Sequence, residues 1–125
     1  MIRIKRLDHY GLNVSNLSRA EAFYSETLGM DIESKMGHMT LLKGGNAVLA
    51  LFENPKIVPG DTEDIKDPLG KAHHAFEVSR EDFQRALERF PQENIPLKGP
   101  IDWGDHDCLY FLDPDGNLLE LISNR

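Results

Sequence analysis

The feature that most constrains the fold is an internal repeat. The segment HYGLNVS at residues 9–15 matches HHAFEVS at residues 73–79, and the histidine, valine and serine agree at one offset of 64 residues (9 to 73). Self-similarity at about half the chain length indicates that one supersecondary unit is used twice. We therefore expect two modules that are built alike.

The segments that follow the two copies agree in kind. Residues 15–29 and 79–91 both carry apolar side chains at helical spacing after a strand-like stretch. Ser18 opens a capping-box pattern in the first segment, and Ser79 is the expected cap of the second, which Pro91 should end. Each module is therefore expected to begin with a strand and an amphipathic helix.

Three short strand-like pieces follow each helix. They read MDIESK, HMTLLK and NAVLALF in the first half and IPLKGP, CLYFL and NLLELI in the second, where DPDG marks a turn. Each half then has the order βαβββ, which is an α+β fold. We predict one domain, residues 1–125, with modules 1–54 and 71–125 joined by a loop at 55–70 that is rich in proline, glycine and charge.

Composition excludes several partner classes. With 14 basic and 21 acidic residues the formal charge is −7, which argues against nucleic acid, because phosphate binding needs a basic patch. A lone cysteine, Cys108, forms no internal disulfide, and no apolar run reaches signal-peptide or membrane-span length. We expect a cytoplasmic protein without membrane contact whose partner is a small molecule.

Strand alternation divides the histidine pair at 73 and 74. His73 falls on the face of small or polar residues, as His9 does in the first copy, whereas His74 shares the face of apolar residues and is assigned to packing. Glu120 lies within the apolar run NLLELI, where a carboxylate is costly to bury unless it is paired or metal-bound. His9, His73 and Glu120 are therefore candidate ligands of a divalent ion.

A second pair of candidates lies on the strand before Glu120. Tyr110, Cys108 and His106 alternate onto one strand face. A phenol at Tyr110 can polarise a substrate oxygen, and His106 can serve as an acid or base near neutral pH. The structural alternatives are that Tyr110 is an aromatic residue of the core and that His106 is a histidine of a loop.

With these residues in hand, the chain resembles the vicinal oxygen chelate superfamily of glyoxalases, bleomycin-resistance proteins, fosfomycin-modifying transferases and extradiol dioxygenases. The motifs are LDHYGLNVSNLSRAEAFYSETLGM, HHAFEV and LYFLDPDGNLLELI. The resemblance implies a curved, half-open mixed sheet with helices on its outer face, a metal in the groove and a homodimer. It puts the ligands at His9, His73 and Glu120, and a substrate-binding tyrosine at Tyr110.

The fourth ligand position of glyoxalases falls on Ala50, which cannot bind a metal. This departure argues against strict lactoylglutathione lyase activity. Fosfomycin thiol transfer is also less favoured, because Gly11 stands where a threonine is common and the chain ends five residues after Glu120 without a basic segment.

We therefore expect a metal-dependent glyoxalase- or dioxygenase-type enzyme acting on a small diol, epoxide or 2-oxoaldehyde. Its cofactor would be a divalent ion, Fe, Mn, Zn, Ni or Mg, that acts as a Lewis acid. The alternative is a metal-free protein that binds a bleomycin-like drug.

Overall fold

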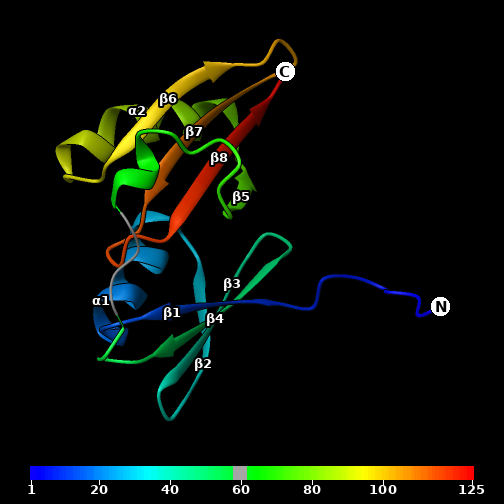
Figure 1. Ribbon diagram of the computed structural model, residues 1–125, viewed down its shortest axis with the longest axis vertical. Helices are drawn as coiled ribbons and strands as arrows, with labels where there is room; N and C mark the ends of the chain where they lie inside the picture. The colour runs from blue at the N-terminus through cyan, green and yellow to red at the C-terminus, as the bar shows by residue number, and fades with distance from the viewer. Residues whose placement is uncertain (58–61) are drawn as a thin grey trace. The chain divides into compact units, whose positions relative to one another are not determined.

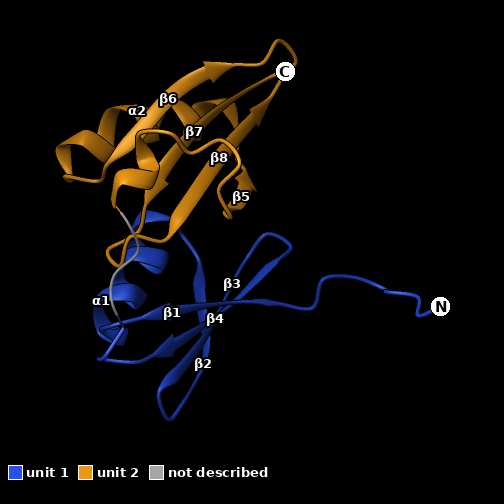
Figure 2. Ribbon diagram, in the orientation of Figure 1, with its two compact units in different colours: residues 1–59 blue, residues 60–125 orange. Residues whose placement is uncertain are grey.

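The computed structural model describes residues 1–57 and 62–125. The chain divides into two compact units, residues 1–59 and 60–125, shown in blue and orange in Figure 2. Each unit has its own sheet and its own helix (Figure 1).

The first unit holds a four-stranded mixed sheet. Its elements in chain order are β1 (Tyr10–Val14), α1 (Leu17–Ala22), the π-helical turn η1 (Phe23–Thr27), β2 (Asp31–Met36), β3 (Met39–Gly44) and β4 (Ala47–Glu53). The strand order is β1-β4-β3-β2, and β1 pairs with β4 in parallel. Residues 1–9 precede the sheet, are exposed and form no helix or strand.

The second unit repeats this architecture. After the short 3₁₀ helix η2 (Thr62–Ile65) come β5 (His74–Glu77), α2 (Arg80–Gln92), β6 (Leu97–Asp102), β7 (His106–Leu112) and β8 (Leu118–Asn124). The strand order is β5-β8-β7-β6, and β5 pairs with β8 in parallel. The predicted α+β fold of two βαβββ modules is confirmed.

Sheet register shows how closely the two units correspond. In the second unit Glu120 on β8 pairs with Ala75 on β5 and with Tyr110 on β7. In the first unit Ala50 on β4 pairs with Gly11 on β1 and with Leu41 on β3. Ala50 is therefore the counterpart of Glu120, as the repeat predicts.

Helix α2 covers one face of the second sheet. Ser79 caps it as predicted, its hydroxyl accepting the Asp82 N–H at 3.1 Å. The apolar stripe of the helix is buried, and the ring of Phe90 lies 5.0 Å from that of Phe111 on β7. The expectation that Pro91 ends the helix is wrong by one residue, because α2 runs to Gln92.

The first helix departs further from its pattern. The capping side chain is Asn16, whose Oδ1 accepts the Arg19 N–H at 2.9 Å, so the predicted cap at Ser18 is wrong. The helix then widens into the π-helical turn η1 instead of continuing to Gly29. Phe23 and Tyr24 of this turn are buried in the core of the first unit.

The region between the units is not a plain loop. Residues 58–61 of the predicted 55–70 connection lie outside the described residues, and Thr62–Ile65 form η2, from which Ile65 packs against the second sheet. The division into one domain with modules 1–54 and 71–125, the half-open joint sheet and the homodimer stay predictions. Among the described residues, no helix is long and apolar enough to cross a membrane.

We predict that Phe83→Ala destabilises the protein by about 3–5 kcal/mol, because Phe83 is 1 % exposed and its loss leaves a cavity under α2. Chemical denaturation measures this change. Gln84→Ala, one residue along on the exposed side of the same helix, is the control and should shift the free energy of unfolding by less than about 0.5 kcal/mol. Equal effects of the two changes would contradict this account of the core.

Candidate metal centre

The candidate centre is built around the carboxylate of Glu120. This residue is 7 % exposed and lies in the middle of β8, between β5 and β7. Within residues 1–57 and 62–125 it forms no ion pair with a lysine or arginine. A buried carboxylate needs a compensating partner, so its neighbours decide what the site can do.

The nearest partner is His73. Its Nε2 lies 3.2 Å from Glu120 Oε1, and its Nδ1 lies 2.7 Å from the Lys71 carbonyl oxygen. A carbonyl oxygen only accepts hydrogen bonds, so we assign the proton of a neutral His73 to Nδ1. The lone pair on Nε2 then faces the carboxylate.

In this tautomer both atoms of the contact, His73 Nε2 and Glu120 Oε1, are hydrogen-bond acceptors. The contact becomes favourable when a proton or a cation lies between the imidazole and the carboxylate. An imidazole nitrogen and a carboxylate oxygen are ligands that divalent transition metals accept, and a backbone carbonyl on the other ring nitrogen is typical support for a ligating histidine. The pair therefore fits a divalent ion, although no third His, Cys, Asp or Glu of residues 62–125 joins it to hold one.

The other histidines of the prediction have different surroundings. His9, the residue before β1 in the first unit, is exposed and contacts Asp8 at 2.8 Å through Nδ1. The set of His9, His73 and Glu120 thus stays a prediction. His74 is half-buried on the apolar side of β5, where burial, followed by the nearby charge of His73, lowers its pKa.

Tyr110 lies beside the pair. Its ring meets that of His73 edge to face at 5.5 Å, and it is directly opposite Glu120 in the sheet. Burial, followed by the negative charge of Glu120, raises the pKa of the phenol to about 12. Tyr110 therefore keeps its proton at neutral pH and acts as a hydrogen-bond donor.

Cys108 continues the same face of β7. The thiol is fully buried, and burial raises its pKa to about 11, with hydrogen bonding to Glu120 contributing in the same direction. Its sulfur accepts the indole N–H of Trp103 at 3.2 Å. No sequence pattern assigns a role to Cys108 or Trp103, and the structure links both to the Glu120 carboxylate.

His106, the second catalytic candidate, is the first residue of β7. His106 and Tyr110 lie on the same face of β7 with Cys108 between them. The four residues from His106 to Tyr110 span roughly 13 Å along the strand. The His106 ring stacks on Trp103 at 6.4 Å, and Nδ1 contacts Asp105 at 2.5 Å. His106 thus adjoins Trp103, and its catalytic role stays a prediction.

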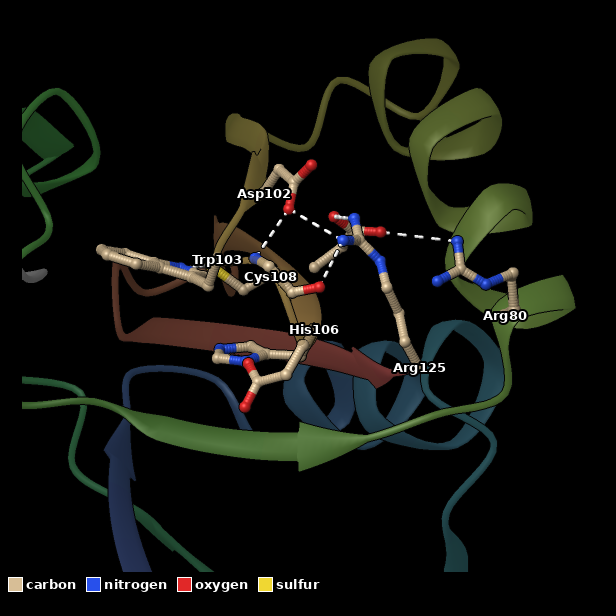
Figure 3. A network of polar contacts seen from close by, with 9 residues as sticks. Arg80, Asp102, Trp103, His106, Cys108 and Arg125 are labelled. Atoms are coloured by element: carbon tan, nitrogen blue, oxygen red, sulfur yellow. Dashed lines mark hydrogen bonds and ion pairs between the residues drawn. The ribbon is translucent and has the colours of Figure 1, made fainter.

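Arg125 braces the turn that carries Trp103, as Figure 3 shows. Its guanidinium contacts Asp102 at 2.9 Å, the Gly104 carbonyl at 2.6 Å and Asp107 at 2.6 Å, and Asp107 also pairs with Arg80 at 3.4 Å. Sequence analysis missed this network, because its members are 18 or more positions from Arg125 and no local pattern connects them.

The comparisons with known proteins agree with this architecture. The family model of the Glyoxalase/Bleomycin resistance protein/Dioxygenase superfamily matches residues 6–121. The chain belongs to this superfamily.

Curated relatives within it carry different activities. The chain is 30 % identical to the glutathione transferase FosA of Serratia marcescens, over 94 % of this chain and 80 % of that protein. It is also 30 % identical to the catechol-2,3-dioxygenase of Bacillus subtilis, over 91 % of this chain and 40 % of the dioxygenase. The family is therefore shown and the substrate is not.

Solved structures share the fold. The fosfomycin resistance protein FosX of Listeria monocytogenes, crystallised with Mn(II) and sulfate, aligns with a TM-score of 0.79 at 20 % identity, covering 98 % of this chain and 93 % of FosX.

We predict that Cys108 resists alkylation in the native protein. With a pKa of about 11, about one thiol in a thousand is ionised at pH 8, against about a quarter in an unfolded chain. Iodoacetamide labelling followed by mass spectrometry should be at least 100-fold slower than in denaturant, and it should accelerate as the pH rises towards 11. Similar rates in folded and unfolded protein would contradict the assignment.

We predict that Arg125→Ala loosens the turn and raises the exposure of Trp103 above its present 49 %. Because Trp103 is the only tryptophan, its fluorescence reports on this turn alone, and its emission should move to longer wavelength as water reaches the indole. Arg85→Ala is the matched control, because within residues 1–57 and 62–125 Arg85 forms exposed ion pairs only with Glu81 and Asp82 on α2. Unchanged emission in Arg125→Ala would show that the brace does not hold Trp103.

Proposed function

We propose that the chain is a metal-dependent enzyme that holds a divalent ion at His73, Glu120 and His9. Its substrate is a small molecule with two adjacent oxygen atoms, such as a diol, an epoxide or a 2-oxoaldehyde. The observation that carries the proposal is the 3.2 Å contact of His73 Nε2 with the buried Glu120 carboxylate, in a pair whose two atoms can both ligate a divalent cation.

Internal symmetry supports His9 as the third ligand. His9 and His73 each stand two residues before a small residue, Gly11 or Ala75, that pairs with the central strand of its own sheet. Ala50 and Glu120 occupy equivalent positions on the central strands β4 and β8, and of these two residues Glu120 alone carries a carboxylate. Two histidines and one carboxylate leave coordination positions for substrate oxygens, the ligand pattern that suits Fe(II) and similar ions.

A divalent ion in this position would act as a Lewis acid on the substrate oxygens. Tyr110, protonated at neutral pH, donates a hydrogen bond to one of those oxygens and stabilises negative charge that develops on it. The Lys71 carbonyl holds the His73 ring in one tautomer and orientation. Buried neighbours limit the access of water to Glu120.

The relatives suggest the reaction classes to test. A catechol dioxygenase and a glutathione transferase are both similar to this chain, and a structure of the same fold contains Mn(II). Oxygen-dependent cleavage of a diol and addition to an epoxide are therefore the first candidates, with the metal among Fe, Mn, Zn, Ni and Mg.

The decisive measurement is metal content. Protein purified without chelator should contain about one divalent ion per chain by mass spectrometry. His9→Ala, His73→Ala and Glu120→Gln should each weaken metal binding by more than about 100-fold, since loss of a supporting contact alone costs about 10- to 100-fold. Oxygen uptake with catechols and thiol addition to epoxides then identify the reaction.

His74→Ala is the matched control, because this neighbouring histidine is assigned to packing and should leave the metal content unchanged. Native protein that binds no divalent metal, with all three ligand variants indistinguishable from it, would refute the proposal. A variant set in which only His9→Ala retains full affinity would limit the ligands to His73 and Glu120.

A further inference from the structure

The face of the second sheet that carries the candidate centre is closed partly by a residue from outside the sheet. Tyr110 is 4 % exposed and Cys108 is fully buried, and both belong to one cluster on this face. Among the described residues, the partly buried apolar side chains packed against this cluster are Ile65, Ile101 and Ile122. Ile101 and Ile122 lie in β6 and β8, where strand pairing holds them. Ile65 alone of the three lies outside the sheet, on η2.

Helix η2 and the residue after it, residues 62–66, form a segment that we call the cover. It lies against β7 (Figure 1). Nζ of Lys98 on β6 donates to the Lys66 carbonyl, and Asp64 Oδ1 lies 3.6 Å from Lys71 Nζ. Because polar contacts between exposed groups contribute little to stability, the packing of Ile65 is the principal contact that holds the cover on the sheet.

A turn connects the cover to β5. The Lys71 N–H donates to the Pro68 carbonyl at 3.1 Å, and Gly70 has a φ of +83°, which glycine adopts without strain. The Lys71 carbonyl in turn contacts His73 Nδ1 at 2.7 Å. A short segment beside such a turn can open locally without unfolding the sheet, because few buried contacts are lost.

We propose that Ile65 controls access to the candidate centre, and that the cover moves away from β7 before a substrate oxygen reaches Tyr110. The closed form keeps water from the phenol, and the open form admits the substrate. This inference rests on the proposed function, in which Tyr110 donates a hydrogen bond to the substrate. The opening itself is a property of the second unit that is measured without substrate or metal.

The test uses Cys108, the only cysteine of the chain, as a reporter of opening. Its thiol lies in the cluster against which Ile65 packs, so opening of the cover increases its access to iodoacetamide. At fixed pH, Ile65→Ala should be alkylated about five- to tenfold faster than wild type, because loss of the apolar contact raises the population of the open form. Lys98→Met removes the ammonium that holds the Lys66 carbonyl and should be alkylated about two- to fivefold faster.

Two matched controls leave these contacts intact. Leu69→Ala removes an exposed apolar side chain next to the cover, and Lys66→Met removes a side chain that pairs with Glu63 but keeps the carbonyl that accepts from Lys98. Both should be alkylated within about twofold of the wild-type rate. Rates at several low urea concentrations separate local opening, which depends weakly on urea, from global unfolding, which depends on it steeply.

Alkylation of Ile65→Ala and Lys98→Met at the wild-type rate would overturn the cover. Acceleration that depends on urea as steeply as global unfolding would overturn it as well. Metal content measured in the same samples tests the proposed function separately. Metal in wild type without acceleration in either variant would overturn the cover alone, whereas no metal in any chain with acceleration in both would overturn the proposed function alone.

Discussion

The second unit depends on the antiparallel pairing of β7 with β8. The turn between them is closed by Asp113, whose carboxylate accepts the backbone N–H groups of Asp115 and Asn117 at 2.9 and 2.8 Å and the Asn117 side-chain amide at 2.9 Å. Because a slip of one residue would turn every side chain to the other face, this turn chemistry fixes Tyr110 opposite Glu120. β5 then joins β8 in parallel, which brings His73 to the carboxylate.

The same pairing separates two environments within one sheet. One face is covered by α2 and is purely apolar at its centre, as the contact of Phe90 with Phe111 shows. The other face carries the polar groups of β7 and β8, namely Cys108, Tyr110 and Glu120, and these are buried as well. A carboxylate held in such surroundings stabilises the fold only when it is compensated, so the chemistry of the centre and the stability of the unit are linked.

Much of the fold was predictable, because it depends on local patterns and on their repetition. The offset between His9 and His73 predicted two equal modules, and the sheet register confirms that Ala50 corresponds to Glu120. Helix ends were less predictable. Both Asn16 and Ser18 have side chains that can cap the N-terminus of α1, and Asn16 is the one that does so. The π-helical turn after Ala22 depends on the packing of its side chains in the core. Neither outcome is encoded by apolar spacing alone.

For the site, the sequence by itself determined the chemical types and their strand faces: a histidine before each first strand, a carboxylate in an apolar strand and a tyrosine ten residues before it. Alternation and repetition are local, so a reading of the chain recovers them. Only the tertiary structure decided that one ring nitrogen of His73 contacts the Lys71 carbonyl while the other contacts Glu120. The same holds for the link from Glu120 through Cys108 to Trp103 and for the contacts of Arg125 with the turn. These contacts join residues from different strands or their ends, where the distance between side chains depends on sheet register and turn geometry and not on spacing along the chain.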